Sequence, residues 1–442
     1  MDRPITGNNM DLALPSLLIP VIDRDSEDWR QLTEVQRALI DMLERETATI
    51  LEDPSHALGL IFGPLARQYA DDEEQTERGL DTLAEMFRVL ARQLKRDLRR
   101  CVRRFVDPAY HEIALPILGI GDSVVRLRTA AFPQEAPRTV EDQRRAYEAR
   151  LIFLMTLQSL DIILRDDPEF RTRLLESMRD DTPEGASDDG TDTGGAIAVS
   201  DDEIRLVRAY FESHELVTGS WEPTSLPIVM SSNQLQCCRF LRPGTSAQSV
   251  EQLADIHGCR VGVPWNDRTI EAYIMIRVKG PLTRWFKFCA KSQSGRTYTP
   301  DAMGVRLVVA DEEFDEMGVW LFANLGVTLA GLTAMPRPGR VPSADATASK
   351  SAFASTRFRA HRVHAMIAGH PVEIQVLPLS VAANVLFSMG DENDRLFAWR
   401  RFQQFLPTIR PPSLFGVEWN NRLVRSKNWR YTMQQLKREL HI

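Results

Sequence analysis

The sequence lacks any apolar run of the roughly 18 residues that a membrane-spanning helix needs, so we expect no membrane-spanning segment. It has no excess of positive charge, because 61 Asp and Glu residues outnumber 54 Lys and Arg residues and leave a net charge of −7. This balance excludes a basic field over the whole chain, although local basic segments exist. The five cysteines are odd in number and show no CxxC spacing, which argues against a disulfide framework or a zinc site. A reducing, cytoplasmic location is the simplest interpretation.

The composition is otherwise that of an ordinary globular protein. Apolar residues make up 43% and charged residues 26% of the 442 residues, which is ample for two or three domains with their own cores. Changes in composition divide the chain into an extended arm at 1–26, a helical domain at 27–179, an acidic flexible linker at 180–203 and a final domain at 204–442. The linker contains DDTPEGASDDGTDTGG, which has no apolar spacing that could build a core.

Helical periodicity dominates the first half of the chain. The clearest pattern covers 74–106, where apolar residues recur every three or four positions. Further helices are expected at 140–178 and 34–51, and together they predict a helix bundle. The face opposite the apolar stripe of 74–106 is rich in arginine. This face is either solvated and paired with neighbouring acidic residues, or a surface that contacts RNA or protein.

Strand patterns appear in the second half. They cover Thr269–Val278, Val305–Ala310 and Val363–Val376, with helical patterns between them. The last of these is expected to be a hairpin that turns at Ala368-Gly369. The segment Thr333–Ala354 is rich in Pro, Ser, Ala and Gly and reads as a long loop. The fold class is therefore predicted to be α+β, with an N-terminal helical bundle followed by a mixed β-sheet domain flanked by helices.

A first group of cations follows a predicted strand in the segment RVKGPLTRWFK. Arg277 and Lys279 share a face of the strand because side chains alternate. Pro281 ends the strand, Thr283 is expected to cap the next helix, and Lys287 lies one turn further on the same side. Three cations and a hydroxyl at a helix N-terminus suit a polyphosphate. A surface strand followed by a basic helix is the alternative interpretation.

Two further segments carry carboxylates. In DAMGVR, Asp301 stands at the start of a buried strand, Gly304 leaves room for close approach and Arg306 adds a phosphate-pairing group. In VEIQV, Glu373 and Gln375 point to the face of the strand opposite its three apolar residues. Either segment alone can be explained by a turn residue or by plain solvent exposure. If Asp301 lies across from Glu373, the two could hold Mg²⁺ on hard oxygen ligands.

The order of the motifs is more specific than any one of them. The chain reads RxKxxxTxxxK, DxxGxR, FRA and VEIQV in that order, and over residues 220–410 it resembles the RelA/SpoT alarmone synthetases. That family has RxKxxxSxxxK, DxxGxR, YRxLH and VEIQxRT. The resemblance implies a nucleotidyltransferase-like fold and an ATP-dependent pyrophosphokinase, which transfers pyrophosphate to the 3′-hydroxyl of GTP or GDP and makes the alarmone of the stringent response.

The resemblance also implies roles for single residues. ATP would be bound by a donor set consisting of Arg277, Lys279, Thr283, Lys287 and Arg306. Asp301 and Glu373 would be catalytic and would bind Mg²⁺, with Glu373 as the general base. The acceptor would be bound by Phe358, which replaces the tyrosine that stacks on the acceptor base, and by Arg362 and Gln375.

The chain departs from the family mainly on the acceptor side. Arg362 stands where the family has the histidine of YRxLH, and Leu377-Pro378 replace Arg-Thr. An adenine nucleotide or the 3′ end of tRNA is therefore an alternative acceptor, and a non-catalytic nucleotide-sensing module is a second alternative. The first half contains no His-Asp pair typical of the metal-dependent hydrolase that accompanies some of these synthetases.

Overall fold

The structure of the 442-residue chain is a computed structural model. It describes residues 24–25, 27–31, 34, 37, 41, 73–116, 124–131, 133, 138–166, 196–197, 201–230, 238–240, 252–292, 303–325, 358–367 and 370–439. Several expectations lie wholly or largely outside these residues. They concern the arm 1–26, the helix 34–51, much of the linker 180–203, the loop Thr333–Ala354, and Asp301.

The chain forms two compact units, each built from segments that are far apart in the sequence. The helical unit comprises Met1–Asp181, Pro281–Tyr298 and Gln403–Tyr431. The sheet unit comprises Thr182–Gly280, Thr299–Phe402 and Thr432–Ile442. The predicted domain boundaries divide the chain linearly, and they stay a prediction.

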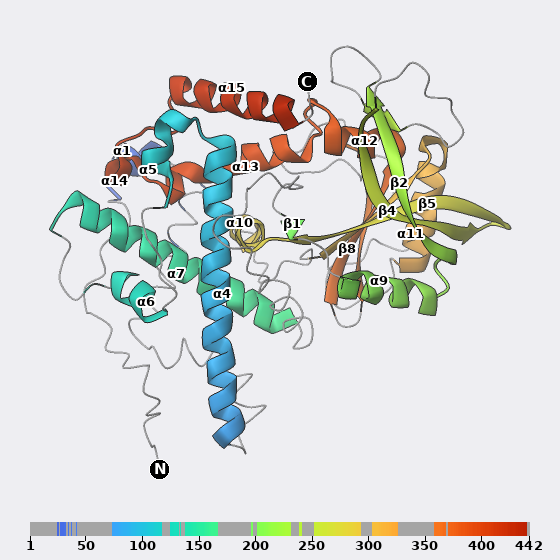
Figure 1. Cartoon of the computed structure of the whole chain (residues 1–442), viewed down its shortest axis with the longest axis horizontal. Helices are drawn as coiled ribbons and strands as arrows, with labels where there is room; N and C mark the ends of the chain where they lie inside the picture. The colour runs from blue at the N-terminus through green and yellow to red at the C-terminus, as the bar shows by residue number, and fades with distance from the viewer. Residues whose placement is uncertain are drawn as a thin grey trace. The chain divides into compact units, whose positions relative to one another are not determined.

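The helical unit is organised around two long helices. Helix α4 (Glu73–Phe105) packs against α7 (Val140–Asp166), and α10 (Pro281–Ser292) packs against both (Figure 1). The remaining helices of this unit are shorter or are shared with the sheet unit: α1 (Glu27–Gln31), η1 (Pro108–Tyr110), α5 (His111–Ala114), α6 (Val124–Ala131), α13 (Asp394–Ile409), α14 (Pro412–Phe415) and α15 (Arg422–Glu439). The boundary between the units passes through α13 and α15.

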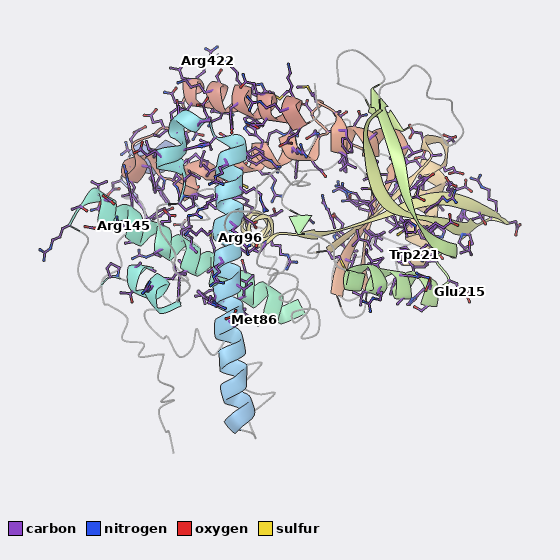
Figure 2. The ribbon with its side chains drawn as sticks, viewed as in Figure 1. Met86, Arg96, Arg145, Glu215, Trp221 and Arg422 are labelled. Carbon is purple, nitrogen blue, oxygen red and sulfur yellow. The ribbon has the colours of Figure 1, made fainter. Side chains whose placement is uncertain are left out.

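Helix α4 is more deeply buried than an amphipathic surface helix. Its predicted apolar stripe is buried from Phe87 to Phe105 except for Cys101, which is half-buried, and Lys95 and Asp97 are buried too. Along the part of α4 whose side chains are described, from Glu85 onward, Arg103 is the one exposed arginine and the others are half-buried. Met86 and Arg96 mark this part in Figure 2. The proposed contact of this helix with RNA or protein stays a prediction.

A buried polar network joins the C-terminal segment of the helical unit to its N-terminal helices. Arg410 on the C-terminal segment lies 3.5 Å from Glu148 of α7, and both side chains are fully buried. The Arg410 guanidinium also donates to the carbonyl of Ala114 at 3.1 Å, and the Tyr147 hydroxyl donates to the carbonyl of Thr408. Because breaking a buried ion pair is costly, this network fixes the C-terminal segment to the bundle.

The sheet unit is built on one sheet with strand order β3-β2-β4-β5-β6-β8-β7, and β1 pairs with one end of β5. Its strands are β1 (Ala196–Ile197), β2 (Thr218–Met230), β3 (Cys238–Phe240), β4 (Gln252–Trp265), β5 (Arg268–Lys279), β6 (Met303–Val309), β7 (His361–Ile367) and β8 (His370–Pro378). All neighbours are antiparallel except β6 and β8, which are parallel. The mixed α+β class is therefore confirmed.

One face of β6, β8 and β7 is largely apolar, and α11 (Phe314–Leu325) packs on it over β8 and β7. His361 of β7 lies on this face and stacks on Phe314 of α11, with ring centroids 4.3 Å apart. Gly318 makes this approach possible, because a Cβ at that position would lie 2.5 Å from the His361 ring. Helix α9 (Asp201–Ser213) also packs on β7, and its Phe211 lies edge-on to Trp221 of β2. Trp221 is labelled in Figure 2.

The other face of the sheet is apolar only in part. Tyr273, Val308 and Leu377 form one row across β5, β6 and β8, and α12 (Leu379–Phe387) packs on it. The rows next to this one are polar, and they carry the candidate site.

Local predictions had mixed outcomes. The strands expected at Thr269–Val278 and Val305–Ala310 are confirmed as β5 and β6, and the hairpin is confirmed by the closing pair Ile367 and His370. The prediction that Thr283 caps a helix is wrong. Helix α10 begins at Pro281, because proline suits the first helical position, where its missing N–H is not needed. No described helix is both long and apolar enough to cross a membrane.

Candidate functional site

The register of four strands places most of the predicted site residues on one sheet face. Arg277, Gly304, Glu373 and His364 form one row across β5, β6, β8 and β7. Met275, Arg306, Gln375 and Arg362 form the next row. Lys279 shares the face of Arg277 because it lies two residues further along β5. We call the six residues Arg277, Lys279, Arg306, Arg362, Glu373 and Gln375 the cationic patch.

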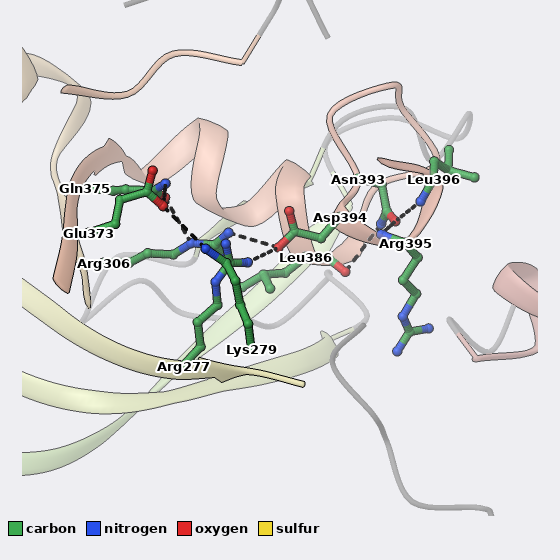
Figure 3. A network of polar contacts seen from close by, with 10 residues as sticks. All are labelled: Arg277, Lys279, Arg306, Glu373, Gln375, Leu386, Asn393, Asp394, Arg395 and Leu396. Carbon is green, nitrogen blue, oxygen red and sulfur yellow. Dashed lines mark hydrogen bonds and ion pairs between the residues drawn. The ribbon is translucent and has the colours of Figure 1, made fainter. Parts of the chain in front are cut away.

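Four residues of the patch, Lys279, Arg306, Glu373 and Gln375, form a chain of polar contacts (Figure 3). Lys279 Nζ lies 3.9 Å from Glu373 Oε2, which accepts a 3.0 Å hydrogen bond from the Gln375 side-chain amide. Gln375 Oε1 in turn accepts from Arg306 Nε at 3.4 Å. Lys279, Arg306, Glu373 and Gln375 are all buried. Their polar atoms are thus held by one another in positions that the strands define.

Asp394 reaches the patch from outside the sheet. One of its carboxylate oxygens, Oδ2, accepts a 3.0 Å hydrogen bond from Arg306 Nη2 and lies 3.4 Å from Arg277 Nη1. Figure 3 shows Asp394 facing both guanidinium groups. This carboxylate joins guanidinium groups from two adjacent strands, which is the arrangement that a phosphate oxygen also favours.

Helix capping holds Asp394 in place. Asp394 is the first residue of α13, and the side-chain oxygen of Asn393 accepts from the backbone N–H groups of Arg395 and Leu396 at 2.8 and 3.2 Å. The Asn393 amide donates to the carbonyl of Ser388 at 2.8 Å. The segment between α12 and α13 is therefore anchored by its own hydrogen bonds.

Positive charge exceeds negative charge on this face of the sheet. It carries four cations (Arg277, Lys279, Arg306 and Arg362), and two carboxylates (Glu373 and Asp394) lie at the same site. Desolvation lowers the pKa of Arg277 to about 10, and the nearby Arg306 charge adds to this effect. Burial by itself would raise the pKa of Asp394, but Arg306 and Arg277 outweigh it and hold that pKa below its ordinary value. Both groups are therefore charged at neutral pH, and the excess cations would stabilise a bound anion.

Phe358, which was predicted to stack on the base of the acceptor, is in contact with Arg362. The Arg362 guanidinium carbon lies 5.1 Å from the centroid of the Phe358 ring, a distance typical of a cation–π contact. Phe358 is half-buried and packs at the edge of the cluster formed by Tyr273, Leu377 and α12. The ring is thus fixed beside the patch, and a stacking base would share or replace the Arg362 contact.

Three predicted site residues are not brought into this network by the described structure. Thr283 and Lys287 lie in α10, which belongs to the helical unit. Their convergence with Arg277 and Lys279 stays a prediction. Asp301 precedes the first described residue of β6 by two positions and lies outside the described residues.

Of the two carboxylates predicted to bind Mg²⁺, Glu373 is the one that the structure describes. This carboxylate is buried on the polar face, and it has the hard oxygen atoms that Mg²⁺ prefers. The described residues include no cluster of three or more His, Cys, Asp or Glu side chains that could hold a metal by themselves. Magnesium ions in nucleotide sites are commonly held by one or two carboxylates and the phosphates of the ligand. Glu373 fits such a site, and a shared ion with Asp301 stays a prediction.

Sequence reasoning did not identify Asp394. The sequence around this residue indicates only the start of a helix, because Asn393-Asp394 before the apolar residues of α13 is a typical helix N-terminus. Nothing in that signal indicates contact with residues of the strands.

Comparison of the chain with models of protein families, with curated proteins and with solved structures gave no match.

Proposed function

We propose that the cationic patch binds the polyphosphate of a nucleotide, and that the protein is an ATP-dependent pyrophosphokinase with a nucleotidyltransferase-like sheet domain. The observation that carries the proposal is the register of β5, β6, β8 and β7. It gathers Arg277, Arg306, Glu373 and Gln375 from motifs spread over about a hundred residues of sequence onto one face. The order of those motifs resembles that of the RelA/SpoT synthetases, and the excess of cations around them suits a polyanion.

The proposed reaction is pyrophosphoryl transfer. The acceptor 3′-oxygen attacks the β-phosphorus of ATP, the bond from that phosphorus to the oxygen bridging the α- and β-phosphates breaks, and AMP leaves. Arg277, Lys279 and Arg306 would hold and neutralise the phosphates. Bound Mg²⁺ would supply further charge neutralisation.

Glu373 would take the proton of the attacking hydroxyl. It is the buried carboxylate of the patch, and the strand holds it next to the cations that would bind the phosphates. In the free protein its Oε2 contacts Lys279 and Gln375. When Lys279 turns to the phosphates, this oxygen becomes available to the acceptor hydroxyl.

Two chemical types of acceptor are candidates. A guanine nucleotide is expected from the resemblance. The contact between Arg362 and Phe358 favours an acceptor with additional negative charge close to its base, such as a 5′-polyphosphate or a nucleic-acid backbone. The second candidates are tRNA, whose backbone carries such charge, and the adenine nucleotides, which carry a 5′-polyphosphate as GDP and GTP do.

The test is a transfer assay with the full chain. ATP labelled in the β- and γ-phosphates is incubated with Mg²⁺ and, separately, with GDP, GTP, ADP and tRNA, and the release of AMP and the label on the acceptor are measured. Arg277→Gln should abolish transfer. Arg268→Gln is the matched control, because Arg268 lies on the same strand and pairs instead with Glu313 and Glu316 of the sheet unit. Binding of ATP without AMP release for any acceptor would favour the nucleotide-sensing module.

A further inference from the structure

Helix α15 carries a strongly basic outer face. Its sequence, RLVRSKNWRYTMQQLKRE, contains six Arg and Lys residues and one acidic residue, which is the last. The chain as a whole has a net charge of −7, so this helix is a local exception to the charge of the protein. Four of its cations lie close together near the start of the helix, and all four are exposed: Arg422, Arg425, Lys427 and Arg430.

Neighbouring carboxylates do not neutralise these four cations. Within the residues that the structure describes, none of the four forms an ion pair, and the guanidinium groups of Arg422 and Arg425 make no hydrogen bond. The nearby segments do contain exposed acidic residues, Glu112 in α5 and Glu418 before α15. Neither lies within ion-pair distance of the four cations, which therefore remain available to a polyanion.

The buried side of α15 holds its outer face in a fixed position. Asn428 is fully buried, and its side-chain oxygen accepts a 2.9 Å hydrogen bond from the backbone N–H of Asp107. The Tyr431 hydroxyl donates to the carbonyl of Arg103, at the end of α4, at 2.7 Å. All four of these residues belong to the helical unit. The Arg103 side chain is exposed as well, so the end of α4 adds positive charge beside α15.

An aromatic side chain is exposed among the cations. Trp429 is 37% exposed, and Arg422, Arg425 and Trp429 occupy positions i, i+3 and i+7 of the helix (Arg422 is labelled in Figure 2). Residues at this spacing lie on one side of a helix. That side therefore combines two guanidinium groups, which suit phosphates, with an indole ring on which an unpaired base can stack.

The exposed apolar residues of α15 do not suit insertion into a membrane surface. Leu423 is 72% exposed, but it lies six residues from Trp429, a spacing that places the two on different sides of the helix. A helix that lies in a membrane surface needs a continuous apolar side. In α15 the continuous stripe with four-residue spacing, which begins at Val424 and ends at Leu436, is buried against the protein.

We propose that the side of α15 formed by Arg422, Arg425 and Trp429 binds a single-stranded segment of RNA, with backbone phosphates on the two arginines and one base on the indole. RNA fits this surface because its loops and ends present unpaired bases next to phosphates. In a duplex the bases are stacked on one another and the indole cannot reach their faces. The inference is independent of the proposed reaction, because it uses no residue of the cationic patch.

The experiment measures RNA binding by the full chain. A labelled oligouridylate, the same strand annealed to its complement, and vesicles containing phosphatidylserine are each titrated over a series of salt concentrations. The variants are the double substitution Arg422→Gln with Arg425→Gln, Trp429→Ala, Trp429→Phe and Arg277→Gln. Arg145→Gln is the matched control, because Arg145 is an exposed arginine of the same unit that pairs with Glu141 (Figure 2). Thermal unfolding of each variant is recorded without RNA.

The wild type should bind the single strand more tightly than the duplex, and the logarithm of its association constant should fall linearly with the logarithm of the salt concentration. The double variant should bind more weakly, with a slope reduced by about 0.7 for each phosphate contact that is lost. Trp429→Ala should weaken binding by about tenfold with the slope unchanged, since stacking releases no counterions. Trp429→Phe should keep part of the affinity, and Arg145→Gln should bind like the wild type.

Four outcomes overturn the inference. One is wild-type RNA affinity in the double variant, whose unfolding temperature should not change because both arginines are exposed. Another is weakened binding in Arg277→Gln but not in the double variant, which would place the RNA on the cationic patch. Equal affinity of the wild type for single strand and duplex would exclude stacking on Trp429. Binding of the vesicles without binding of RNA would identify an anionic membrane as the partner.

Discussion

Arg306 and Asp394, which are 88 residues apart in the sequence, are joined by a 3.0 Å hydrogen bond. The bond connects the interior strand β6 to the first residue of α13, and the same carboxylate oxygen lies 3.4 Å from Arg277. In the free protein, Asp394 thus makes the contacts that we propose for a phosphate oxygen. A ligand and this carboxylate would compete for the same two arginines.

Asp394→Asn tests that competition. Without ligand, the variant should lose about 1–2 kcal/mol of unfolding free energy, less than for a fully buried pair because Asp394 and Arg277 are partly exposed, although Arg306 is buried. Tripolyphosphate should then raise its unfolding temperature more than that of the wild type, since the two arginines are no longer paired. Asp391→Asn is the control, because Asp391 is exposed in the same segment. An equal shift in both variants would contradict the competition.

The same carboxylate predicts a pH dependence of stability. The pKa of Asp394 is lowered from its ordinary value of 3.8, so its contribution is fully present above about pH 4 and is lost as the pH falls through the lower pKa of the folded state. The difference in unfolding free energy between wild type and Asp394→Asn should therefore shrink below about pH 4. This difference is measured by denaturant titrations at about five pH values between roughly pH 2.5 and pH 7. A constant difference would contradict the assignment.

Glu373→Gln should separate binding from transfer. The substitution keeps the shape of a buried side chain and removes the charge, so ATP binding should persist while AMP release falls by about 100-fold or more. Single-turnover assays with labelled ATP give both quantities. Glu316→Gln, on α11 of the same unit, should leave transfer unchanged. Undiminished AMP release by Glu373→Gln would exclude Glu373 as the base.

The pair formed by Phe358 and Arg362 should control the acceptor. Phe358→Ala should weaken acceptor use by about 1–3 kcal/mol, the magnitude of base stacking on an aromatic ring, with little change in ATP binding. Arg362→His should shift preference toward GDP and GTP, because it removes a permanent cation from the ring. Transfer rates to GDP, GTP, ADP, ATP and tRNA measure the shift. Equal losses for all acceptors in Arg362→His would rule out a role in specificity.

The buried pair of Glu148 and Arg410 should dominate the stability of the helical unit. Glu148→Gln leaves a fully buried guanidinium without its carboxylate and should cost about 3–5 kcal/mol of unfolding free energy. Glu141→Gln, which breaks the exposed pair of Glu141 and Arg145 on the same helix, should cost less than about 1 kcal/mol. Denaturant unfolding of the two variants gives the comparison. Similar costs would show that Glu148 is not essential to the network.

The alternation of side chains along a strand and the order of the motifs can both be read directly from the sequence. The sequence by itself therefore determined which residues share a strand face and which fold class the chain adopts. The pairing of Arg277 with Lys279, and of Glu373 with Gln375, on one strand face follows from the two-residue period of a strand. The α+β class and the strands β5, β6, β7 and β8 follow from the same periodicity. The long strands β2 and β4 were not predicted, since Pro and Gly within Thr218–Met230 and Gln252–Trp265 weaken the strand pattern.

Only the tertiary structure decided which strands are neighbours and what covers them. The row of Arg277, Gly304, Glu373 and His364 depends on the register between four strands, and register is set by packing over the whole face rather than by any one segment. Asp394 reaches the site through the position of α13. Its sequence neighbourhood predicts only a helix start. Long-range packing places it beside Arg277, because a helix pattern specifies which side is buried but not against which residues.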